Sequence, residues 1–161
     1  MTMMKKFDKE FIERTLEILE NLSSKTEYEV TLLLNCLLAL VTLPIEREKE
    51  SDLVEFQRIC NRKLKELKNP ELYIGKKLSR KYFFRNIRNS IAHLYIDPKP
   101  NTNGKYIDGV ILRNYTDSGN CNFLISISVE NLKKFAVFVA EEYLKILNEK
   151  ELKLEDKNGD D

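Results

Sequence analysis

Apolar residues recur at helical spacing along most of the chain. They repeat about every three to four positions, which is the period of an α-helix that buries one face. This pattern predicts helices over residues 8–22, 27–43, 53–68, 84–96 and 129–147. Polar stretches separate these segments and suit turns. The sequence therefore predicts a bundle of about five helices.

Before the last helix, the spacing changes to that of β-strands. Residues 106–115 have strand composition, and residues 122–128 alternate between apolar and polar positions. Residues 117–120 read Asp-Ser-Gly-Asn, a turn sequence that joins the two segments. Residues 97–104 contain two prolines and cannot continue the preceding helix. We expect a mainly α fold, a helical bundle with an appended β-hairpin before the last helix, and a loop at residues 73–75.

The helix over residues 27–43 is apolar nearly all round, as expected for a helix at the centre of a bundle. It is expected to end before Pro44. Asn35 interrupts its leucine-rich run, and a buried amide needs hydrogen-bond partners. Two interpretations remain open: Asn35 is a satisfied core amide, or it orients Arg88 or His93.

Length and composition indicate one soluble domain. The chain has 161 residues, and we expect a single domain over residues 1–148 and a charged, frayed tail over residues 149–161. Its 42% apolar and 33% charged content is typical of a globular protein. The apolar run over residues 30–45 is shorter than the ~20 residues that span a bilayer. With no signal-peptide pattern at the start, we expect a cytoplasmic protein that does not bind membranes.

Cysteine and histidine content argues against a metal site. Cys36, Cys60 and Cys121 are widely spaced and form no C-x-x-C pair, so we expect free thiols in a reducing compartment. The chain has one histidine, His93, which makes a histidine-based metal centre improbable. We expect no cofactor.

The predicted helix over residues 84–96 holds the most unusual chemistry. At ~100° per residue, one side is apolar and carries Phe84, Ile87, Ile91 and Leu94. The other side carries Arg85, Arg88, Asn89, Ala92 and His93. Residues 72–96 contain no acid, although the whole chain has a net charge of only +1. A cationic strip beside a titratable imidazole suits a phosphodiester ligand.

The segment Arg88 to His93, R-N-S-I-A-H, resembles the signature of the HEPN superfamily (higher eukaryotes and prokaryotes nucleotide-binding domains). That signature is an arginine, usually followed by asparagine, aspartate or histidine, and then a histidine after four to six intervening residues. Residues 28–46 are similar to an early helix of a bacterial HEPN subgroup, and the resemblance covers most of residues 28–147. A small residue, often glycine, commonly follows the histidine in that subgroup, whereas this chain has Leu94.

The resemblance implies an all-helical domain that forms a homodimer, in which two motifs make one composite cleft. Many such proteins are metal-independent ribonucleases that act as toxins or in antiviral defence. We therefore expect an endoribonuclease in which His93 is the general acid or base, Arg88 stabilises the phosphate and Asn89 positions either group. Arg85 and Lys81 are expected to steer RNA into the cleft.

Two further expectations come from the same resemblance. In HEPN toxins paired with a nucleotidyltransferase antitoxin, a tyrosine two residues after the histidine can be adenylylated. Tyr95 occupies that position, and it is either such a modification site or a core residue. Some HEPN domains bind nucleotide, RNA or a partner without cleaving anything. The near-neutral net charge favours that alternative, because unaided affinity for RNA is largely electrostatic.

Overall fold

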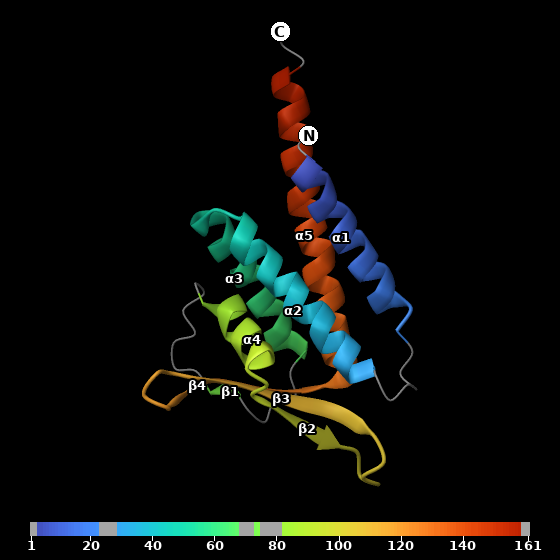
Figure 1. Ribbon diagram of the computed structural model, residues 1–161, viewed down its shortest axis with the longest axis vertical. Coiled ribbons are helices and arrows are strands. Elements are labelled where there is room, and N and C mark those ends of the chain that lie inside the picture. The colour runs from blue at the N-terminus through green and yellow to red at the C-terminus, as the bar shows by residue number, and fades with distance from the viewer. Residues whose placement is uncertain (1–2, 23–28, 68–72, 75–81, 159–161) are drawn as a thin grey trace.

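The computed structural model describes residues 3–22, 29–67, 73–74 and 82–158. The helices in these residues are α1 (Met3–Glu20), α2 (Glu29–Arg47), α3 (Glu50–Leu67), α4 (Phe83–Ala92) and α5 (Val129–Asn158). The strands are β1 (Tyr73–Ile74), β2 (Ile96–Pro100), β3 (Ile107–Tyr115) and β4 (Cys121–Ser128). The helices lie on one side of a small sheet that precedes α5 in the chain (Figure 1). The predicted mainly α fold is confirmed.

The sheet is antiparallel and has the strand order β1-β4-β3-β2. Its centre is the predicted hairpin of β3 and β4, in which Leu112 lies opposite Ile125. The flanking strands were not predicted. β2 contains two prolines, which are tolerated because it is an edge strand. β1 falls where a loop was expected, and its two residues are too few to give a periodic signal.

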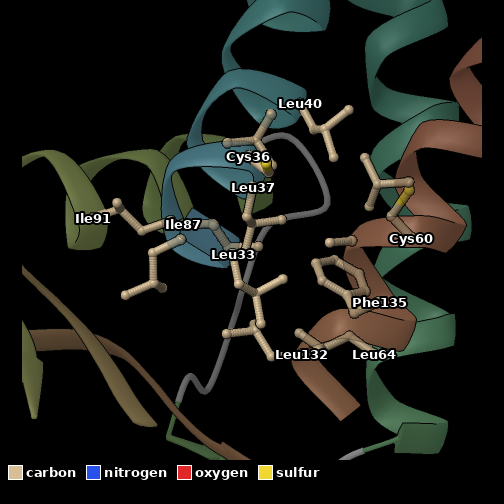
Figure 2. Packing of buried hydrophobic residues seen from close by; sticks show 14 of the residues in the cluster. Leu33, Cys36, Leu37, Leu40, Cys60, Leu64, Ile87, Ile91, Leu132 and Phe135 are labelled. Carbon is tan, nitrogen blue, oxygen red and sulfur yellow. The ribbon is translucent and has the colours of Figure 1, made fainter. Parts of the chain in front are cut away.

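The core forms where α2 meets α4 and α5. Leu33 and Leu37 of α2 are fully buried, and Ile87 and Ile91 of α4 point toward them (Figure 2). By length and apolar content alone, α2 would suffice to cross a membrane, but here it packs in the core against α1, α4 and α5. Asn35 lies on its outer face and is exposed. The expectation of a buried core amide was therefore wrong, because only part of this apolar helix faces the core.

Two helices end later than the sequence predicted. α2 continues through Pro44, which is buried and whose carbonyl accepts a hydrogen bond from the Glu48 N–H at 2.9 Å. Packing of this turn offsets the ~3 kcal/mol that proline costs inside a helix. α5 runs on to Asn158, so the expected frayed tail is helical over residues 149–158. At the start of this extension, Lys9 of α1 forms an ion pair with Glu151 at 3.2 Å.

Candidate functional site

Helix α4 presents the predicted polar residues to solvent. Arg85, Ala92 and His93 are exposed, and Arg88 and Asn89 are half-buried. The opposite face is apolar and packs in the core through Phe84, Ile87 and Ile91, which are almost fully buried. The helical periodicity therefore assigned the two faces of α4 correctly.

Two hydrogen bonds that involve polar side chains join α4 to its neighbours, and a third lies within the helix. The Phe84 N–H donates to Gln57 Oε1 of α3 at 2.8 Å, which satisfies one of the free N–H groups at the start of the helix. The buried amides of Asn86 and Asn114 bond at 2.9 Å, which joins α4 to β3. The Ser90 hydroxyl donates to the Asn86 carbonyl at 2.8 Å. The bonds to Gln57 and Asn114 fix α4 relative to α3 and β3.

The C-terminal end of α4 turns sharply at Leu94. The Leu94 N–H donates to the Ile91 carbonyl at 3.1 Å, and the Tyr95 N–H donates to the Ser90 carbonyl at 2.8 Å. This pair of bonds is the Schellman motif, which requires a left-handed residue and usually takes glycine. Leu94 supplies it with φ of 57°. Leu94 is 79% exposed, so its expected core position was wrong, as was a helix reaching residue 96.

His93 is consequently the C-cap residue that directly follows α4, and it is exposed to solvent. The ring makes no hydrogen bond to another described residue, and its recorded neighbour is the Tyr95 ring, 5.6 Å away between centroids. Arg88 Nε and Nη2 lie 3.4 and 3.3 Å from Asn89 Oδ1, so the amide braces the guanidinium. The remaining guanidinium N–H groups are available to an anion. Asn35 makes no hydrogen bond to Arg88 or His93 within the described part of the chain.

The basic side chains expected to steer RNA are described only in part. Arg85 is exposed, and its guanidinium carbon lies 5.8 Å from the centre of the Tyr82 ring. Lys81 lies outside the described residues. Charge on the outer side of α4 is thus carried, in the residues described, by Arg85 and Arg88.

Tyrosine side chains extend the site beyond α4. Tyr95 is 42% exposed, so the interpretation of Tyr95 as a core residue was wrong. Its ring meets that of Tyr115, at the end of β3, edge to face with centroids 5.0 Å apart. Sequence reasoning missed Tyr115 because only the pairing of β2 with β3 brings it to the motif. No set of three metal-ligating side chains occurs in residues 3–22, 29–67, 73–74 and 82–158.

A helical bundle with an arginine and a histidine on the outer face of one helix has the architecture of a HEPN domain. Residues 1–150 match the sequence profile of the family HEPN pEK499 p136, and the chain belongs to that family. No curated protein and no solved structure matches the chain significantly.

Proposed function

We propose that this protein is a metal-independent endoribonuclease that acts as a homodimer. The observation that carries the proposal is that α4 presents the guanidinium of Arg88, which is half-buried, and that the C-cap residue of the same helix, His93, is exposed to solvent. An imidazole and a guanidinium are the groups that cleavage of RNA without a metal requires. His93 is also free of hydrogen bonds to other described residues, so both its ring nitrogens are open to a substrate.

The reaction transfers the phosphorus from the 5′-oxygen to the neighbouring 2′-oxygen. A base takes the 2′-hydroxyl proton, the 2′-oxygen attacks phosphorus, and an acid protonates the departing 5′-oxygen. The products are a 2′,3′-cyclic phosphate and a 5′-hydroxyl. The Arg88 guanidinium stabilises the negative charge on the phosphate oxygens. Asn89 holds that guanidinium in position through its amide oxygen.

One chain supplies one histidine, whereas the reaction uses a base and an acid. A dimer with its two α4 helices face to face supplies both. The outer face of α2, which packs along α4, supports this arrangement. Leu32 is exposed on that face, and Leu38, Ala39 and Leu43 are only partly buried, so a second copy would cover apolar surface. Ala92 is small and exposed on α4, which permits close approach.

Product analysis tests the reaction. The protein is incubated with a defined RNA in excess EDTA, and the fragments are tested for ligation with and without removal of the 3′-terminal phosphate. We expect ligation only after end repair, no cleavage by His93→Ala and Arg88→Ala, and full cleavage by Arg62→Ala, which changes an exposed arginine of α3. Cleavage that stops in EDTA would contradict the metal-free reaction.

The biological setting that we propose is a toxin–antitoxin pair or antiviral defence. The partner is a nucleotidyltransferase-like antitoxin that adenylylates Tyr95. The exposure of Tyr95 and its position 5.6 Å from the His93 ring support this role, because a nucleotide there would block the cleft and add negative charge. Mass spectrometry after incubation with a neighbouring transferase and ATP tests it, and an unmodified Tyr95 would contradict it.

The alternative function is a dimeric module that binds nucleotide, RNA or a protein partner without cleavage. The net charge of +1 favours this alternative, since strong unaided RNA binding needs a basic surface. Expression in a bacterial host separates the two functions. A nuclease slows growth of the host, and His93→Ala relieves the slow growth. A binding module leaves growth unchanged, or slows it to the same extent with and without His93→Ala.

A further inference from the structure

Three exposed rings form a continuous row that begins at the motif. The His93 and Tyr95 rings lie 5.6 Å apart, and the Tyr95 and Tyr115 rings lie 5.0 Å apart. His93 and Tyr95 lie in the connection between α4 and β2, and Tyr115 is the last residue of β3. Two separate parts of the fold therefore contribute to this row of rings.

The backbone fixes the position of this row. The Arg113 N–H donates to the Tyr95 carbonyl at 2.9 Å, so Tyr95 already pairs with β3 before β2 begins. The Arg113 side chain forms an ion pair with Asp97 across the same two strands. The buried bond between Asn114 and Asn86 then ties this end of β3 to α4. These contacts fix the backbone that carries Tyr95 and Tyr115 beside the motif.

These two tyrosines differ from the other exposed tyrosines in their position beside the motif. Tyr95 and Tyr115 are 42% and 39% exposed, although aromatic side chains in a monomer gain most from burial. Neither hydroxyl makes a hydrogen bond to another described residue. Exposed tyrosine rings next to phosphate-binding groups are typical of surfaces on which unpaired bases stack.

We propose that Tyr115, together with Tyr95, forms a stacking site for an unpaired base that flanks the scissile phosphate, so that the substrate is single-stranded RNA. The inference rests on the proposed function, and it names the substrate class of that same cleft. The phosphate lies between Arg88 and His93, and the adjacent nucleotide leaves the cleft along the ring row and stacks on the tyrosines. A base inside a duplex is already stacked on its neighbours and offers no free face.

Binding of an RNA that cannot be cleaved tests the inference separately from catalysis. The probe is a fluorescent 2′-O-methyl RNA, as a single strand or annealed to its complement, and the readout is fluorescence anisotropy. Tyr115→Ala should weaken single-strand binding about 5- to 150-fold, the equivalent of ~1–3 kcal/mol for one stacked base. Tyr115→Phe should bind like the wild type because it keeps the ring. Tyr106→Ala is the matched control, since Tyr106 is 70% exposed and makes no ring contact in the described residues.

Three results would overturn the stacking site: wild-type affinity in Tyr115→Ala, equal loss in Tyr115→Phe, or a duplex that binds as tightly as the single strand. Thermal unfolding of each variant confirms that the exposed ring was removed without loss of the fold. Failure of the ribonuclease proposal gives a different result. A protein that binds the probe through Tyr115 but leaves ordinary RNA intact contradicts cleavage and retains the stacking site.

Discussion

The hydrogen bond between the Asn86 and Asn114 amides should contribute to the free energy of unfolding, because it joins α4 to β3. Its Nδ2 to Oδ1 distance is 2.9 Å, and the two residues are only 8% and 6% exposed. Replacing either one with alanine removes the bond and leaves the other amide buried without that partner. An unsatisfied buried polar group costs about 1–3 kcal/mol. Each single substitution should therefore lower the free energy of unfolding by about that amount.

The double substitution gives the sharper test. Asn86→Ala together with Asn114→Ala removes both polar groups, so the second change no longer leaves a partner unsatisfied. We expect the double variant to lose less stability than the sum of the single variants, with a coupling of ~1 kcal/mol in the range typical of contacting residues. The midpoint of thermal unfolding should fall by ~2–4 °C per kcal/mol.

Urea unfolding at one fixed protein concentration measures these free energies, because the stability of the proposed dimer would depend on concentration. Asn148→Ala is the control, since Asn148 is an exposed asparagine within α5. It should change stability by less than ~0.5 kcal/mol. Single variants of Asn86 and Asn114 that unfold like the wild type, or effects that add without coupling, would refute the role of the pair.

Leu94→Gly should stabilise the fold by up to ~1 kcal/mol in the same urea assay. The substitution removes the ~1–2 kcal/mol cost of a left-handed leucine, and the greater entropy of glycine in the unfolded chain cancels ~0.5–1 kcal/mol of that gain. A lower stability would contradict the turn. In a native thiol titration, Cys121 alone should react, because burial raises the pKa of the Cys36 and Cys60 thiols; three thiols reacting at one rate would contradict their burial. Burial and the neighbouring Glu48 carboxylate raise the pKa of Tyr143. The free energy of unfolding should therefore fall above pH ~10, where the Tyr143 hydroxyl ionises in the unfolded chain but not in the folded protein. Tyr143→Phe should weaken that decline, and an unchanged decline would contradict the assignment.

Periodicity was sufficient to predict the faces of α4. Its apolar residues recur at helical spacing, so the exposure of Arg85 and His93 and the partial exposure of Arg88 followed from their angular positions. The β3–β4 hairpin followed from alternation and a turn sequence for the same reason: both signals are local. Local patterns carry the position of a side chain on its own element.

Contacts and exposures that depend on distant parts of the chain could not be predicted from local patterns. Asn86 resembles any helical asparagine until β3 brings Asn114 to within 2.9 Å of it. The outer face of α2 looked buried because apolar residues surround the whole helix, and only the packed structure leaves Asn35 in solvent. Tyr115 belongs to the site through strand pairing alone. The end of α4 at Leu94 was missed because leucine is rare at a left-handed helix end.

The rate of RNA cleavage in excess EDTA, measured for the wild type and for His93→Ala, tests the central claim most directly. General acid–base catalysis by a histidine contributes about 10²–10⁴-fold. The account predicts that the wild type cleaves RNA at an unchanged rate after chelation, and that His93→Ala is slower by at least ~100-fold while remaining folded. A wild type inactivated by EDTA, or a His93→Ala variant as fast as the wild type, would contradict it.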